Sequence, residues 1–201
     1  MTIQEWLRAD TEHVMLAILF TDIVGSTALQ RELGDQAYSA VRRAHFAQAR
    51  RFIAAFHGYE VKTIGDSFYV VFRTAIEAFD FAIDLYTDTG HDRVKLRFGI
   101  HVGAVHIEEG KDVYGNAVNY TKRVMDTAKE GGIVLSQDAM RQVDFEKAPQ
   151  HQGIIYVQSE HSLQGFEGNH RLYTAARKRP QGVASKIFHG SWSPDTKALK
   201  A

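Results

Sequence analysis

The sequence has no cysteine, only three prolines and no long hydrophobic run. Without cysteine it can form neither disulfides nor thiolate metal sites, which fits a reducing compartment, so we expect a cytoplasmic protein. No stretch approaches the roughly 20 apolar residues of a membrane span. The first residues, Met1 to Val14, carry acids where a signal peptide needs a basic start and an apolar core. We therefore expect a soluble chain with no membrane span.

An excess of charge of either sign is also missing, because Lys plus Arg and Asp plus Glu each total 24. The basic footprint of a nucleic-acid-binding protein is absent, so we expect no nucleic-acid partner. The chain has 201 residues and 44% hydrophobic content, which is enough for one well-buried domain with modest extensions.

Apolar runs and helical spacings alternate along the chain. The run from His13 to Asp22 is apolar almost throughout and predicts a strand buried on both faces. Residues 34–58 predict a long amphipathic helix with Asp35 as N-cap and Gly58 as stop. The same reasoning predicts strands at 59–64, 68–72 and 94–107, helices at 75–86 and 116–128, a short strand and helix at 133–143, and a strand pair within 154–175.

This order predicts an α/β sandwich (α+β) with a mostly antiparallel sheet covered by helices. Two nucleotide-binding folds are not supported, because no GxGxxG follows the first strand and no Walker A sequence occurs.

Two carboxylates draw attention to one end of this sheet. Asp22 ends the first core strand, and Asp66 lies on the turn of the following hairpin, so the two could converge. Mg²⁺ is usually held by one or two carboxylates plus substrate phosphates, and the turn after Asp22 offers backbone amides for a polyphosphate. The alternative is that Asp22 caps a helix and Asp66 fits its turn, which for either residue alone is the better explanation.

Four motifs together resemble the class III nucleotidyl cyclase domain, the family of adenylate and guanylate cyclases. They are "FTDIVGST", "GYEVKTIGDSF", "RFGIHVGAV" and "DVYGNAVNYTKR", and their order and separations agree with the family. The resemblance spans residues 14–176 and implies the ferredoxin-like class III cyclase fold. Residues 1–13 are then an N-terminal extension and 177–201 a C-terminal tail.

The resemblance implies a two-metal site and a pair of catalytic residues. Asp22, Asp66 and the carbonyl of Ile23 would bind two Mg²⁺ or Mn²⁺ ions, which assist in-line attack of the ribose 3′-hydroxyl on the α-phosphorus with release of pyrophosphate. Asn119 would orient the ribose, and Arg123 would stabilise charge on the α-phosphate.

We expect the turn after the first strand to bind phosphate. The family often uses a lysine as well, and this chain lacks it. The turn residues are Ile23, Val24, Gly25, Ser26 and Thr27. Gln164 stands where the family often has a phosphate-binding Lys, so either Lys111, Arg97 or a tail residue compensates, or the affinity for the triphosphate is weak.

Base choice is assigned in the family to the positions of Lys62 and Asp112, a pair that resembles adenylate cyclases and favours ATP. Lysine donates to adenine N1 and aspartate accepts from the N6 amine. Cytosine offers the same local pattern, and the family's small residues are replaced by Tyr120, Thr121 and Lys122, which could narrow the pocket. A pyrimidine (UTP or CTP) cyclase of a bacterial anti-phage system is therefore the alternative.

Active members of the family combine metal carboxylates from one chain with base, ribose and transition-state residues from its partner. The resemblance therefore implies a head-to-tail homodimer with two composite sites. A non-enzymatic alternative is an inactive cyclase fold that only binds nucleotide or dimerises. The presence of all six expected side chains counts against it.

Overall fold

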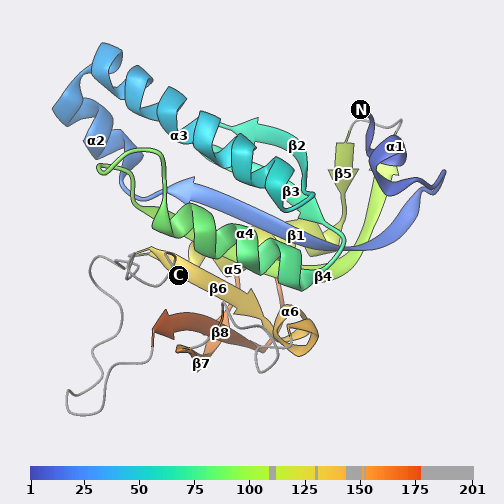
Figure 1. The fold of residues 1–201 in the computed structure, drawn as a ribbon. Helices are drawn as coiled ribbons and strands as arrows, with labels where there is room; N and C mark the ends of the chain where they lie inside the picture. The colour runs from blue at the N-terminus through green and yellow to red at the C-terminus, as the bar shows by residue number, and fades with distance from the viewer. Residues whose placement is uncertain (109–111, 130, 144–150, 152, 178–201) are drawn as a thin grey trace, which may run out of the picture.

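The computed structural model describes residues 1–108, 112–129, 131–143, 151 and 153–177. Eight strands form one sheet in the order β2-β3-β1-β4-β6-β8-β7, and β5 pairs with β4 off this path (Figure 1). The β4–β6 pairing is parallel, and the other pairings are antiparallel. The predicted mostly antiparallel sheet is therefore confirmed.

The strands follow the apolar runs of the sequence closely. Their bounds are β1 His13–Ile23, β2 Tyr59–Ile64, β3 Ser67–Phe72, β4 Leu96–Glu108, β5 Asp112–Tyr114, β6 Gly132–Ser136, β7 Ile154–Ser162 and β8 Asn169–Arg177. β1 lies centrally between β3 and β4 and is buried from Leu16 to Thr21, as a strand covered on both faces should be.

Helices cover both faces of the sheet. Their bounds are α1 Ile3–Leu7, α2 Ser26–Leu33, α3 Asp35–Ala55, α4 Ala75–Thr87, α5 Asn116–Asp126 and α6 Gln137–Gln142. Residues of α3, α4 and α6 share one apolar cluster with the sheet, and residues of α1 and α5 form a second cluster on the other face. Figure 1 shows α3 and α4 in front of the sheet and α5 behind it.

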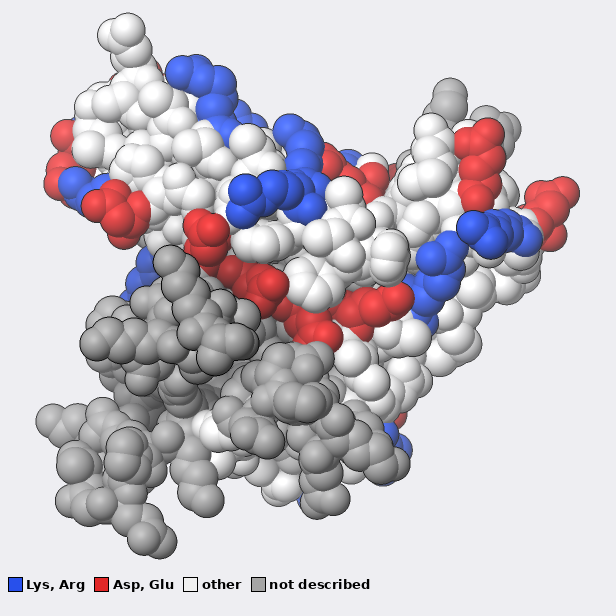
Figure 2. All heavy atoms as spheres, viewed as in Figure 1, with Lys and Arg blue, Asp and Glu red and all other residues white. Residues whose placement is uncertain are grey.

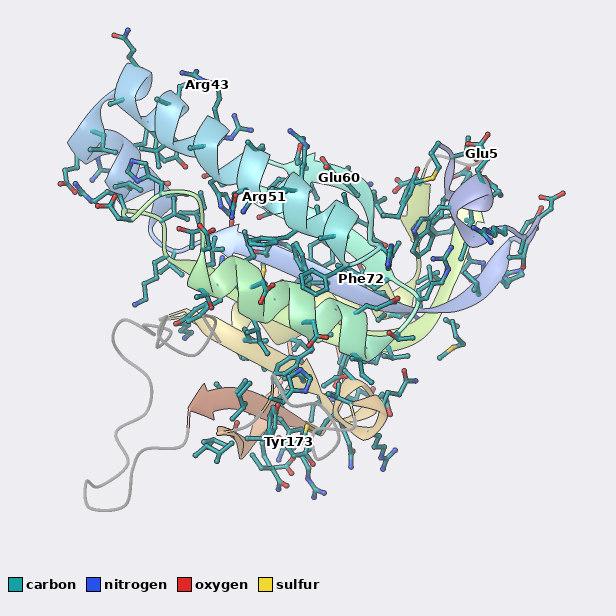
Figure 3. All side chains as sticks on the ribbon, in the orientation of Figure 1. Glu5, Arg43, Arg51, Glu60, Phe72 and Tyr173 are labelled. Atoms are coloured by element: carbon teal, nitrogen blue, oxygen red, sulfur yellow. The ribbon has the colours of Figure 1, made fainter. Side chains whose placement is uncertain are left out.

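The main core lies between the sheet and the α3–α4 layer. Phe68, Phe79 and Phe81 are fully buried in this layer, and Tyr69 is buried in the cluster on the opposite face. Figure 3 labels Phe72, another buried ring of this layer, which contacts Phe81 of α4 with 5.3 Å between ring centroids. Within the described residues, no helix combines the length and apolar character that a membrane crossing needs.

Two short helices, the three-residue strand β5 and one cap differ from the expectation. The sequence did not predict α1 or α2, although Thr2 forms a capping box with Glu5 at the start of α1. The predicted N-cap Asp35 is wrong, because Gly34 is the N-cap of α3 and Asp35 is its first helical residue. The Asp35 carboxylate instead accepts a hydrogen bond from Gln30 of α2.

Candidate functional site

Adjacent ends of β1 and β3 carry the two predicted metal carboxylates. Asp22 lies near the end of β1, and Asp66 precedes β3 in the turn that follows β2. Ser67, next to Asp66, donates a 2.8 Å hydrogen bond to Asp22 Oδ1. The strand register aligns Thr21 of β1 with Phe68 of β3. The two acids therefore lie close together at the same end of these neighbouring strands.

Each of these carboxylates faces an arginine of the same chain. Arg97, the cross-strand neighbour of Asp22 on β4, donates to Asp22 Oδ2 from Nη2 at 2.6 Å and from Nε at 3.0 Å. Arg42 of α3 lies 3.4 Å from Asp66 Oδ1 and donates to the Gly65 carbonyl. Both predicted metal carboxylates therefore lie next to positive charge of the same chain.

α3 contributes two residues to this site that sequence reasoning missed. Tyr38 and Arg42 are one turn apart, so they lie on the same face of the helix. Burial raises the pKa of Tyr38 to about 12, and the neighbouring Asp66 carboxylate adds to this rise. Helical spacing alone could have paired Tyr38 with Arg42, but not with Asp66.

The predicted catalytic residues lie on α5, on the opposite side of the sheet from α3. Asn119 and Arg123 are separated by four positions, so they project from adjacent turns. The helix lies directly on β4, because a Cβ built on Gly99 would meet the backbone nitrogen of Met125 at 2.4 Å. Arg123 Nη1 lies 3.3 Å from Asp126 Oδ2 at the end of the same helix.

Lys62 and Asp112 are brought into direct contact. Lys62 Nζ lies 2.7 Å from Asp112 Oδ2 and 2.9 Å from Oδ1, and both side chains are 45% exposed. Beside the pair, Tyr69 donates its hydroxyl proton to the Val113 carbonyl. Two residues that are 50 positions apart thus form one exposed ion pair.

The predicted phosphate-binding turn is only partly available. Ile23 still belongs to the β1–β4 ladder, and the Val24 amide donates to the Lys95 carbonyl, so the expectation of a free amide at Val24 is wrong. Gly25 is the N-cap of α2 without a side-chain cap, which leaves the first amides of this helix, at Ser26 and Thr27, as candidate anion donors.

The position of the missing lysine and its expected substitutes lie in different parts of the chain. Gln164 is exposed in the turn between β7 and β8. Arg97 is at the Asp22 carboxylate, as described above. Lys111 and the tail from 178 onward lie outside the described residues.

Three bulky residues of α5 point in different directions. The ring of Tyr120 packs against Phe166 and His170, and its hydroxyl is 3.1 Å from His170 Nδ1. Thr121 is buried and donates to the Ala117 carbonyl. Lys122 Nζ is 5.7 Å from the centroid of the Phe20 ring on β1. Two of the three side chains are therefore used in packing within the chain.

The donor set can be compared with what metals require. Among the described residues, no three His, Cys, Asp or Glu side chains cluster closely enough to form a metal cage. Two carboxylates and a backbone carbonyl are hard oxygen ligands, which suit Mg²⁺ or Mn²⁺ shared with substrate phosphates. Asp22 and Asp66 each pair with an arginine, so both carboxylates are placed as anions next to positive charge. These residues therefore fit the metals implied by the sequence.

The surface on the α3–α4 side is divided by charge. Figure 2 shows Asp and Glu side chains in a band along α4, with Lys and Arg gathered above it along α3. Residues of α5, including Asn119 and Arg123, belong to the other side of the sheet. The predicted catalytic residues of α5 therefore lie away from this charged band, whereas Arg42 of α3 borders it and contacts Asp66.

Comparison with known proteins gives one consistent result. The family model of the adenylate and guanylate cyclase catalytic domain matches residues 9–174. Adenylate cyclases of Podospora anserina and Streptomyces coelicolor are 30% and 31% identical over 64% and 60% of this chain. The matched regions make up only 7% and 32% of those two relatives, so the chain spans a minor part of their length.

Solved structures show the same fold at lower identity. An adenylyl cyclase from P. aeruginosa has a TM-score of 0.74 and 18% identity, covering 85% of this chain and 98% of that one. A guanylate cyclase domain from Catenaria anguillulae, solved in complex with GTP, has a TM-score of 0.71 and 18% identity, covering 85% and 100%.

Proposed function

The chain belongs to the adenylate and guanylate cyclase catalytic domain family, and on that premise we propose that it converts ATP to 3′,5′-cyclic AMP and pyrophosphate. The proposal has two levels. The reaction class follows from the family, and the choice of ATP follows from the residues at the base-binding positions.

The contact between Lys62 and Asp112 carries the choice of ATP. The ammonium supplies a donor and the carboxylate an acceptor within 2.7 Å of each other, the complement of adenine N1 and N6. Guanine presents the opposite order, with a donor at N1 and an acceptor at O6. The Lys62 donor would then face a donor, and the Asp112 acceptor would face an acceptor. Leaving such polar groups unpaired is what makes a hydrogen-bonding site reject the wrong ligand.

The structure also bears on the pyrimidine alternative. One argument for that alternative is bulk from Tyr120, Thr121 and Lys122 in the base pocket, whereas the Tyr120 ring packs against Phe166 and His170 and Thr121 is buried. These contacts support a pocket that is not narrowed by either residue. ATP therefore remains the substrate that we propose.

The metal-binding half is proposed for Asp22, Asp66 and the Ile23 carbonyl. When bound, Mg²⁺ or Mn²⁺ supplies charge neutralisation for the triphosphate and lowers the pKa of the attacking hydroxyl. The chain's own contribution is to hold the two carboxylates at adjacent strand ends, with Ser67 fixing one oxygen of Asp22. Positioning and electrostatics of this kind provide most of the catalysis in phosphoryl transfer.

The remaining residues are proposed to position the nucleotide. Asn119 holds the ribose, and the Arg123 guanidinium neutralises charge that develops on the α-phosphate. The first amides of α2 face the polyphosphate, and Arg97, already at Asp22, supplies positive charge that Gln164 cannot.

We propose that these halves meet between two chains. Asp22 and Asp66 of one chain would face Lys62, Asp112, Asn119 and Arg123 of its partner in a head-to-tail homodimer. Each homodimer then carries two composite sites, and a single chain carries none.

The test is a product assay with each of the four nucleoside triphosphates and Mn²⁺, with cyclic products identified by mass spectrometry. We expect cyclic AMP from ATP, and no product from the Asp22→Ala variant. Exclusive formation of cyclic UMP or cyclic CMP would overturn the ATP proposal and favour the pyrimidine alternative. Saturable nucleotide binding with no turnover in any of the four reactions would favour an inactive binding module.

A further inference from the structure

Four charged side chains of alternating sign form a continuous line from the metal carboxylate to α5. Asp22 is joined to Arg97 by two hydrogen bonds, the shorter 2.6 Å. Arg97 Nη1 lies 3.9 Å from Asp126 Oδ1, and Asp126 Oδ2 lies 3.3 Å from Arg123 Nη1. The Arg97 guanidinium therefore stands between two carboxylates and is held closely by only one of them.

We propose that Asp126 is a positioning residue for the metal site, which accepts the Arg97 guanidinium when a divalent cation displaces it from Asp22. The proposal rests on the function proposed above, because it takes Asp22 as a metal ligand. Asp126 itself is not proposed as a ligand.

Charge balance gives the reason for such an acceptor. A cation on Asp22 would compete with Arg97 for that carboxylate, because two positive groups on one carboxylate repel each other. Arg97 is only 25% exposed, so a displaced guanidinium is not simply released to water. Asp126, 37% exposed, is the second carboxylate within reach, and a small side-chain rotation would close the 3.9 Å gap.

Close packing explains why Asp126 is within reach. Gly99 lets the end of α5 approach β4 so closely that no side chain fits beneath Met125. Arg97 is two positions before Gly99 on β4, on the same face, and Asp126 follows Met125. The helix end is thus fixed above the Arg97 side chain.

The place of Asp126 in its helix is otherwise unfavourable. It is the last residue of α5, where the carbonyl end of the helix dipole disfavours a negative charge. Its contacts with Arg97 and Arg123 offset this cost. An acid at this position is therefore better explained by its arginine neighbours than by helix stability.

The experiment measures the affinity of the full chain for Mn²⁺ alone, from the electron paramagnetic resonance signal of free Mn²⁺. We expect Asp126→Asn to weaken Mn²⁺ binding by about three- to fivefold, because Arg97 then competes for Asp22 without an alternative partner. Asp126→Glu should restore most of the affinity. Asp138→Asn is the matched control, because Asp138 also forms an i,i+3 ion pair with an arginine, Arg141 on α6, and its loss should leave the affinity unchanged.

A double-variant cycle with Arg97→Gln separates this role from simple attraction of cations by a nearby charge. Arg97→Gln should strengthen Mn²⁺ binding, and Asp126→Asn should have no further effect in that background. An equal loss of affinity from Asp126→Asn with and without Arg97 would overturn the proposal. If Asp22→Ala also left Mn²⁺ binding unchanged, the proposed metal site itself would be wrong, which is a distinguishable outcome.

Discussion

Gly99→Ala is a one-methyl change that should move the proposed catalytic helix. The added Cβ would lie 2.4 Å from the Met125 nitrogen and 2.7 Å from the Met125 Cα. These are backbone atoms, so no side-chain rotation relieves the clash, and α5 must shift away from β4 by roughly 1 Å to restore ordinary contact distances. Asn119 and Arg123 would move with the helix.

Both stability and activity should respond. Overpacking of this kind lowers the free energy of unfolding by about 2 kcal/mol, or roughly 4–8 °C in Tm for a chain of this size. A misplacement of about 1 Å at a reacting centre can lower turnover by about 100-fold. The measurements are thermal unfolding and the rate of cyclic product formation at a temperature where the variant is folded.

Gly58→Ala provides the matched comparison. Its Cβ would meet the Phe72 ring at 2.6 Å, so it should also destabilise the chain, but Phe72 belongs to the α3–α4 layer and not to α5. Turnover per folded molecule should therefore be nearly normal in Gly58→Ala. If Gly99→Ala retained wild-type turnover, or if both variants lost it equally, the close contact between α5 and β4 would not be what positions Asn119 and Arg123.

Two further predictions concern assembly and pH. Mixing Asp22→Ala chains with Arg123→Ala chains should restore roughly a quarter of the wild-type activity. Half of randomly formed dimers are mixed, and each mixed dimer holds one intact site out of two. If dimers form without any recovered activity, each site lies within one chain. Burial lowers the pKa of His101 to about 4, so the unfolded chain binds this proton first as the pH falls. The free energy of unfolding should decrease by about 2 kcal/mol between pH 7 and pH 5, and urea titrations of His101→Gln should lack that part of the decrease.

The strands were predictable because their physical signal is local. A continuous apolar run such as 13–22 can hardly be placed except in the centre of a sheet, and β1 is indeed central. The helices α1 and α2 were missed because each is short and begins without a long periodic pattern. Gly25 at the start of α2 has a left-handed backbone, φ 69°, which in sequence is indistinguishable from an ordinary turn glycine.

The pairing of charged residues was not predictable from the sequence. Arg97 meets Asp22 because of the β1–β4 register, across 75 positions, and no local pattern fixes that register. Lys62 and Asp112 were assigned to one role by family resemblance, and the structure adds that they form an ion pair with each other. The role of each residue in turnover stays a prediction.

The charged residues of the proposed site neutralise one another within the single chain. The pairs are Asp22 with Arg97, Asp66 with Arg42, Lys62 with Asp112, and Arg123 with Asp126. A metal–nucleotide complex carries both signs of charge. When it binds, each charged side chain exchanges its partner in the chain for an oppositely charged group of the complex. Each exchange breaks one favourable pair to form another, and the net gain in binding is therefore smaller than the new contacts suggest. On this basis specificity comes from geometry. Only a ligand that offers cations to Asp22 and Asp66 and acceptors to the arginines provides a new partner for every side chain whose ion pair it breaks.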